Sequence, residues 1–335
     1  MPFRAITGHS HLLELMAAAA SRGSLPPSLI LAGPEGVGKR MAGIALAQLL
    51  NCTALVSPNE SEPSDACGVC SSCSRIPRGV HPDVLLIEPG ETGSIKIEAV
   101  RDAIERAAYR PFEGRRRVVI VDEADAMVSE AQNALLKTLE EPPPASVFVL
   151  VTSRPDLLVI TVRSRCQRLR FGRLAPGEVA GVLMSAHGYD PEAAHAAASA
   201  SDGSVGAALE AASEDFTDAR AAAQRLLEIA AASADPRRRL EGSKYLAGRA
   251  AADREELGRR LRALAAMLRD LVALRLRADD RSLANADLKP ALSRLLGAFD
   301  GDRPVRAFDA VHKALDALDR NASPKIVADW VAMQV

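Results

Sequence analysis

The segment at residues 33–40 constrains the fold more than any other part of this sequence. It reads GPEGVGKR, the pattern G-x-x-x-x-G-K followed by an arginine. Glycines in such a loop let backbone N–H groups turn toward phosphate oxygens, and the lysine reaches the outer phosphates. The loop follows an apolar run at residues 28–32 and leads into helical sequence at residues 40–50. We therefore expect a strand–loop–helix unit of the phosphate-binding kind, with the candidate residues Gly33, Gly36, Gly38 and Lys39. The alternative is a glycine-rich turn that arises by chance, and whether a nucleotide binds here stays open.

Arg40 departs from the pattern of loops that hydrolyse nucleotides. Those loops carry Ser or Thr after the lysine, and the hydroxyl group binds Mg²⁺. Arg40 puts a fixed positive charge there instead, and like charges repel strongly in a partly dry site. The chain is therefore built like an ATPase but poorly equipped to be one, which indicates a subunit that works beside a motor. Binding of ATP or ADP without hydrolysis stays open.

Apolar runs in the first half of the chain predict five buried strands. They lie at residues 28–32, 84–87, 117–121, 147–151 and 167–171. Segments with helical spacing separate them, as at residues 97–109 and 129–139. Strands of this kind, alternating with helices, predict a parallel sheet that is covered on both faces.

Strand signals end at Leu174, and the rest of the chain reads as helices. Short helices with breaks at Gly188 and Gly203 are expected up to residue 212, and longer helices after it. We therefore expect an α/β domain followed by two all-α domains. Their predicted ranges are 1–172, 173–212 and 213–335.

The composition excludes some classes of protein. A hydrophobic content of 48% and a charged content of 25% are typical of a globular chain. The formal net charge of −1 provides no basic field for nucleic acid, and 3% aromatic residues argue against stacking of single strands. No apolar run reaches the roughly 18–20 residues of a membrane span, and the N-terminus lacks the apolar core of a signal peptide. We expect a cytoplasmic protein with no membrane contact.

Four of the five cysteines suggest a metal site. Cys67, Cys70 and Cys73 form C-x-x-C-x-x-C, and Cys52 lies upstream. Structural Zn²⁺ takes four such ligands in a tetrahedron, which leaves no position for water. An iron–sulfur cluster and unliganded thiols are the alternatives. Cys166 lies far along the chain and is not expected to be a ligand, and the pattern fits a reducing compartment.

Asp122 and Glu123 end the third predicted strand, at the edge where open α/β sheets bind ligands. In an ATPase the first carboxylate supports the metal and the second orients the attacking water. The alternative is an acidic pair stabilised by the N-terminus of a helix. Because both carboxylates are present, this feature alone permits hydrolysis and conflicts with Arg40.

Arg165 lies just before the fifth predicted strand, within Ser164-Arg165-Cys166. An arginine at that place could stabilise charge on the γ-phosphate of a neighbouring subunit, as arginine fingers do. The alternative is an arginine at the surface or at the edge of the sheet.

Together these motifs resemble the AAA+ clamp-loader family of bacterial replication. The resemblance rests on GPEGVGKR, the four cysteines, His81-Pro82-Asp83, VVIVDEAD at 118–125, NALLKTLEEPP at 133–143 and TVRSRCQRLRF at 161–171. It covers residues 1–212 well, and over residues 213–335 it rests on helical composition and position. It implies an AAA+ P-loop domain with a RecA-like parallel sheet and a zinc module inserted at residues 52–73. The two helical domains would be a lid and an oligomerising collar.

The resemblance also implies roles for single residues. Thr152 stands where the family has a polar sensor at the end of the fourth strand, and Arg165 would be an arginine finger that acts in trans. The family contains motor subunits and non-hydrolysing subunits. Motor subunits carry an arginine that senses the γ-phosphate in the lid, where this chain has Gly206. Arg40 and Gly206 therefore favour a subunit whose nucleotide site is vestigial or non-hydrolysing.

The implied function is that of a non-motor, stator-like subunit in the ATP-dependent loading of a sliding clamp onto primed DNA. Its partners would be the gamma/tau motor subunits and the delta subunit in a hetero-pentamer, as part of the DNA polymerase III holoenzyme. Trp330 and the aliphatic positions of residues 305–335 would serve the packing of the collar. One alternative is an ATP-hydrolysing motor subunit of the gamma/tau kind. Another is a zinc-dependent nucleic-acid-binding adaptor with a vestigial ATPase fold.

Overall fold

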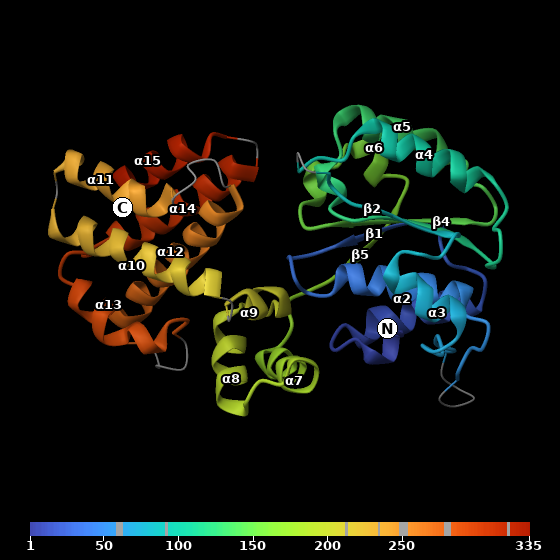
Figure 1. Ribbon diagram of the computed structural model, residues 1–335, viewed down its shortest axis with the longest axis horizontal. Coiled ribbons are helices and arrows are strands. Elements are labelled where there is room, and N and C mark those ends of the chain that lie inside the picture. The colour runs from blue at the N-terminus through green and yellow to red at the C-terminus, as the bar shows by residue number, and fades with distance from the viewer. Residues whose placement is uncertain are drawn as a thin grey trace. The chain divides into compact units, whose positions relative to one another are not determined.

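The computed structural model of the chain describes residues 1–57, 63–90, 93–211, 214–233, 235–247, 254–277, 283–319 and 322–335. Two compact units make up the chain, Met1–Glu178 (unit 1) and Val179–Val335 (unit 2) (Figure 1). The predicted boundary between the two helical domains, at residues 212–213, lies outside the described residues. The predicted division into three domains stays a prediction.

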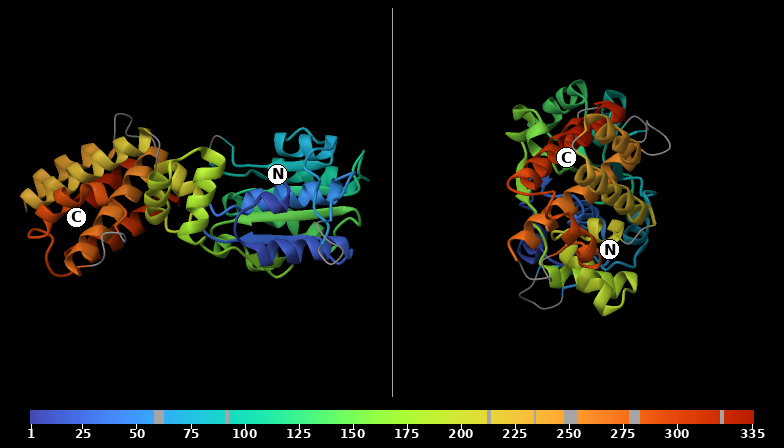
Figure 2. Two further views of the ribbon diagram at one scale, coloured as in Figure 1. Left: turned by 90° about the horizontal axis from the view of Figure 1, so that it is seen from below. Right: turned by 90° about the vertical axis from the view of Figure 1, so that its left-hand side faces the viewer.

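Unit 1 is a five-stranded parallel sheet with helices on both faces (Figure 1). The strands are β1 (Ser28–Ala32), β2 (Val84–Ile87), β3 (Arg117–Val121), β4 (Ser146–Thr152) and β5 (Gln167–Arg170). They lie side by side in the order β2-β3-β4-β1-β5. Figure 2 shows the ribbon from two further sides. The helices are α1 (Ser10–Ser21), α2 (Lys39–Asn51), α3 (Ser71–Arg75), α4 (Ile97–Ala108), α5 (Ser129–Glu140) and α6 (Ile160–Arg163). The α/β fold and the predicted strands are confirmed, with strand ends that differ by no more than one residue.

Alternation along the strands builds two cores, one on each face of the sheet. Leu29 and Leu31 of β1 are buried in one core, together with Leu46 of α2. Ile30 belongs to the other core, which also contains Leu135 of α5. Helices α1 and α2 therefore cover one face of the sheet, and α4 and α5 cover the other (Figure 1).

Parallel pairing brings the carboxyl ends of the strands to one edge of the sheet. The chain leaves β1 directly into the glycine loop, leaves β3 at Asp122, and ends β4 at Thr152. Residues that are far apart in the sequence therefore meet around the N-terminus of α2, as open α/β sheets arrange their ligand sites.

The described part of unit 2 contains helices and no strand, as predicted. The helices are α7 (Pro176–His187), which begins at the end of unit 1, α8 (Pro191–Ala200), α9 (Val205–Ala211), α10 (Glu214–Ala232), α11 (Pro236–Ala247), α12 (Arg254–Arg275), α13 (Lys289–Leu295), α14 (Arg303–Asp319) and α15 (Pro324–Gln334). Gly188 and Gly203 adopt positive φ between the short helices, so the predicted breaks are present.

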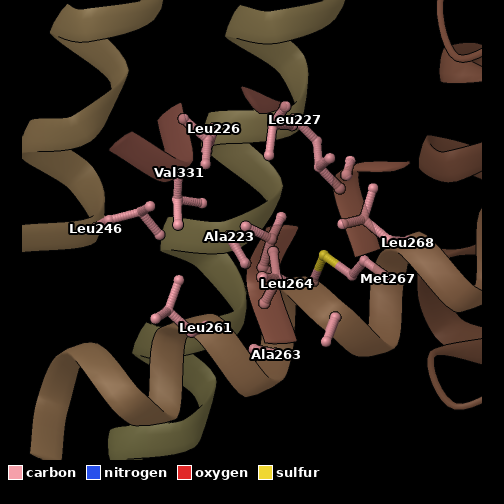
Figure 3. Close-up of a cluster of buried hydrophobic side chains, with 14 of the residues drawn as sticks. Ala223, Leu226, Leu227, Leu246, Leu261, Ala263, Leu264, Met267, Leu268 and Val331 are labelled. Carbon is pink, nitrogen blue, oxygen red and sulfur yellow. The ribbon is translucent and has the colours of Figure 1, made fainter. Parts of the chain in front are cut away.

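One hydrophobic core lies within residues 219–335. In Figure 3, Leu226, Leu246, Leu264 and Val331 converge from four different helices. This core joins α10, α11, α12, α13, α14 and α15 into one bundle, and among the residues whose burial is described none of its members comes from α7, α8 or α9. Trp330 of α15 is 40% exposed at its surface.

Candidate functional site

The glycine loop adopts a backbone that its glycines make possible. Gly36 and Gly38 have φ values of 69° and 95°, which L-residues with a side chain rarely adopt. A Cβ atom on Gly33 would lie 2.2 Å from the carbonyl oxygen of Phe171, so no side chain fits there. Gly38 ends the loop as the residue that caps α2. The loop thus presents the N-terminus of a 13-residue helix at the carboxyl edge of the sheet, which favours anion binding.

Lys39 lies along the base of this loop. Its Nζ atom donates to the carbonyl oxygens of Gly33, at 2.7 Å, and Pro34, at 2.5 Å. The residue is 7% exposed, and burial lowers the pKa of its ammonium group, although nearby carboxylates oppose that shift. A bound phosphate would take this ammonium from the two carbonyl oxygens. The residues of the loop therefore fit the phosphates of a nucleotide.

Arg40 occupies the place where a hydrolysing loop holds its metal. Its Nη1 atom lies 2.6 Å from Glu88 Oε1 and 3.4 Å from Asp122 Oδ2. In a P-loop enzyme, Mg²⁺ is held between the residue after the lysine and an acidic residue at the end of another strand of the sheet. Here the first position is Arg40 itself, and its guanidinium group contacts Asp122 at the second position. The residues present do not fit a magnesium ion bound in that way.

The two acidic residues after β3 lie in different environments. Asp122 has a side chain that is 13% exposed, and burial raises the pKa of its carboxyl group while Arg40 lowers it. Burial and the charge of Asp122 both raise the pKa of Glu123. Glu123 adopts a left-handed backbone with a φ of 48°, which is uncommon for a residue with a side chain and is often found at functional sites.

The hydroxyl group of Thr152 is bound within unit 1. It donates to Asp125 Oδ1 at 2.5 Å and accepts from the backbone N–H of Arg154 at 3.0 Å. Arg154 Nε in turn donates to Asp125 Oδ2 at 2.9 Å. The carbonyl oxygen of Thr152 accepts from Gly33 N–H at 3.2 Å, which ties the end of β4 to the glycine loop. This arrangement links the predicted sensor to the loop but gives its hydroxyl group two protein partners.

The four predicted metal ligands lie together. One sulfur from each of Cys52, Cys67, Cys70 and Cys73 lies within 4.8 Å of the others. The Sγ atoms of Cys52 and Cys70 are 4.0 Å apart, as are those of Cys67 and Cys73. Four sulfurs around a zinc ion at about 2.3 Å would be separated by about 3.8 Å. The cluster can therefore hold a metal ion with tetrahedral geometry. Cys166 is not part of this cluster, and burial raises the pKa of its thiol to about 12.

Backbone N–H groups also face this cluster. Val69 and Cys70 donate to Cys67 Sγ, at 3.4 and 3.3 Å, and these bonds lower the pKa of the Cys67 thiol. Such donors stabilise thiolates, the form that binds a metal. Arg4 holds the module from outside, because its guanidinium group donates to the carbonyl oxygens of Ala66 and Cys67 at 2.6 and 2.9 Å. The module is thus fixed to the rest of unit 1.

Arg165 lies between α6 and β5, away from the glycine loop in the sequence. Its Nε atom donates to Glu140 Oε1 at 2.8 Å, Nη2 donates to the same oxygen, and Nη1 donates to the carbonyl oxygen of Thr161 at 2.8 Å. The side chains of Arg165 and Glu140 are 31% and 49% exposed. Arg165 is therefore held in a defined orientation at the surface of unit 1. Gly206 lies in the first turn of α9 in unit 2.

The sequence patterns did not predict several residues of the site. Glu88 follows β2, and only the order of the strands brings it to Arg40. Asp125 lies two residues after the predicted acidic pair, so its place at the carboxyl edge could have been anticipated. Glu140 ends α5, and no local pattern connects it with Arg165.

None of the helices that the structure describes combines the length and the apolar character that a membrane span requires.

Comparison with known proteins identifies a family whose model matches this chain. A family model described as DNA polymerase III, delta subunit, matches residues 8–175. The DNA polymerase III subunit tau of Escherichia coli K12 is 33% identical over 212 residues, which are 62% of this chain and 32% of that protein. The subunit tau of Bacillus subtilis 168 is 31% identical over 180 residues, or 53% of this chain and 30% of that protein. The chain thus spans about a third of the length of these curated relatives.

The solved structures to which this chain is similar include a DNA polymerase III gamma subunit-related protein from Thermotoga maritima. It is 18% identical, with a TM-score of 0.38, over 92% of this chain and 98% of that one.

Proposed function

The chain belongs to the DNA polymerase III delta-subunit family, and we propose that within it the chain is a non-motor subunit of the sliding-clamp loader, of the delta-prime kind. In this role it does not hydrolyse ATP itself. It joins gamma/tau motor subunits and a delta subunit in a pentameric ring that loads the sliding clamp onto primed DNA. Its Arg165 completes the ATP site of an adjacent motor subunit.

The contact of Arg40 with Asp122 is the observation that carries the proposal. It puts a guanidinium group between the two positions that would hold Mg²⁺. Without the metal, the developing charge on the phosphates loses its strongest stabilisation, and the loss of even one such contact costs about 10²–10³ in rate. The hydroxyl group of Thr152 donates a hydrogen bond to Asp125, and Gly206 has no side chain that could contact a γ-phosphate. Both features support a subunit that does not hydrolyse ATP.

The surroundings of Arg165 are compatible with a role in trans. An exposed ion pair such as Arg165–Glu140 contributes only about 0–1 kcal/mol to stability. Breaking it costs little, so a γ-phosphate on a neighbouring subunit can compete for the same guanidinium group. Meanwhile the bond to the Thr161 carbonyl keeps the side chain directed along the surface. Arg165 is thus oriented but not locked.

The remaining assignments follow from the same proposal. Cys52, Cys67, Cys70 and Cys73 bind a structural Zn²⁺ that fixes the loop after α2. Residues 173–212 form the lid, and residues 213–335 form the collar through which the subunits join. The single continuous core within residues 219–335 supports a separate collar domain.

A motor subunit is the second candidate function. Lys39, Asp122 and Glu123 are all retained, and the curated relatives named above are tau subunits. Turnover of ATP by the isolated full chain in Mg²⁺ distinguishes the two candidates. We expect no turnover above that of the Lys39→Ala variant. Turnover that the Lys39→Ala substitution abolishes would establish the motor role instead.

A further inference from the structure

The contacts of Arg40 indicate in which form the glycine loop binds a nucleotide. This question is separate from whether the nucleotide is hydrolysed. The guanidinium group is bound to Glu88 at 2.6 Å and to Asp122 at 3.4 Å, both through Nη1. Both carboxylates follow strands that end at the same edge of the sheet as the glycine loop. Arg40 therefore crosses the space between the N-terminus of α2 and the acidic residues, where a metal would otherwise join them.

The group that forms this bridge is a guanidinium. It is a better partner for phosphate than the ammonium of lysine, because its N–H groups form a planar fork. The Arg40 side chain is 46% exposed, so a ligand that enters the loop from solvent can reach it. With Nη1 on the carboxylates, the guanidinium group still has N–H groups at Nη2 and Nε to donate to phosphate oxygens.

A divalent cation at this place would meet opposition from two sides. It would lie against a fixed positive charge, and it would have to displace that charge from Asp122, the carboxylate it needs as a support. The hydroxyl ligand that would favour the cation is missing at position 40. The glycine loop and Lys39 keep the groups that bind phosphate, whereas the groups that bind the metal are replaced.

We propose that Arg40 takes the place of Mg²⁺ in this loop, so that the site binds a nucleoside diphosphate or triphosphate as the metal-free anion. The proposal rests on the proposed function, because an inert site is one that has no use for the metal. Lys39 leaves the Gly33 and Pro34 carbonyl oxygens and pairs with the outer phosphate. Arg40 keeps its contact with Asp122 and donates to the inner phosphates.

Titration of the full-length chain with ADP, by calorimetry, in buffer with Mg²⁺ and in buffer with EDTA tests this directly. The wild type should bind ADP in EDTA at least as tightly as in Mg²⁺, within about threefold. Arg40→Thr restores the usual hydroxyl group, and its affinity in EDTA should be about tenfold or more below that of the wild type, because a charged donor to phosphate is lost. In Mg²⁺ this variant should recover affinity. Arg101→Thr, an arginine on the exposed side of α4, is the matched control and should bind like the wild type in both buffers.

Two results would overturn the inference. One is wild-type binding that is about tenfold or more weaker in EDTA than in Mg²⁺. The other is no binding of ADP at concentrations up to about 1 mM in either buffer. Both differ from failure of the proposed function, which would show as ATP turnover by the isolated chain. Circular dichroism of each variant confirms that its fold is intact.

Discussion

Replacement of Asp83 by alanine should destabilise unit 1 strongly. This carboxylate is fully buried and accepts backbone N–H groups of Phe112, Glu113 and Gly114 at 2.7–2.9 Å. It also binds Arg117 Nη2 at 2.8 Å, and the side chain of Arg117 is only 9% exposed. Removing one partner of a buried ion pair leaves the other charge uncompensated, which costs about 3–5 kcal/mol. We expect a loss of that size in the free energy of unfolding at pH 7.

The pH dependence of this loss has a definite sign. Burial alone would raise the pKa of Asp83, but the three N–H groups and the Arg117 guanidinium outweigh it and hold the pKa below its ordinary value. Stability from a carboxylate with a lowered pKa is fully present above its unfolded pKa, near 4, and is lost as the pH falls through the folded pKa. The difference between wild type and Asp83→Ala should therefore be constant at neutral pH and shrink below about pH 4.

Urea denaturation of the full chain, followed by circular dichroism, measures this prediction. Trp330, the only tryptophan, reports unit 2 separately by its fluorescence. Asp102→Ala is the matched control, because Asp102 has a side chain that is 67% exposed and pairs with Arg106 on the same helix at 3.6 Å. It should change stability by no more than about 0.5 kcal/mol. A loss below about 1 kcal/mol for Asp83→Ala would refute the reasoning.

Two further predictions concern the cysteine cluster and the helical core. The purified chain should carry about one zinc ion. Cys70→Ser should lower the zinc content, measured by metal analysis, and the resistance of the module to proteolysis, measured by limited digestion. Stoichiometric iron, or no metal at all, would contradict the assignment. Leu264 is fully buried in the core of unit 2 (Figure 3), so Leu264→Ala should cost about 2–5 kcal/mol in denaturation followed by Trp330 fluorescence. An unchanged Trp330 transition would show that Leu264 is not part of a well-packed core.

The sequence predicted the sheet well because its signals are local. Apolar runs such as residues 117–121 are long enough to be read as buried strands, and the glycine loop fixes what precedes and follows it. Spacing alone also predicted that Cys67, Cys70 and Cys73 would cluster, since C-x-x-C turns bring sulfurs close together. The division of the helical half and the role of Arg165 stay predictions.

The partners of the charged residues could not be predicted, because they depend on the order of the strands. Arg40 meets Glu88 only because β2 ends at the same edge of the sheet as β1 and β3, although 48 positions separate the two residues in the sequence. Similarly, Arg165 meets Glu140 because α6 packs near the end of α5. Sequence patterns describe one element at a time, whereas these contacts arise from tertiary packing.

The central claim is that this chain supplies an arginine to a neighbouring ATP site. DNA-stimulated ATP turnover by the reconstituted loader tests it most directly, with Arg165→Ala in this chain alone and with Arg163→Ala as the matched control. Arg163 lies two residues away and pairs with Asp156 at 2.8 Å. With assembly intact by size, the account predicts a loss of about 10³-fold at the site that Arg165 serves, as for other arginine fingers, and little change for Arg163→Ala. Turnover that is unchanged by Arg165→Ala would contradict the account.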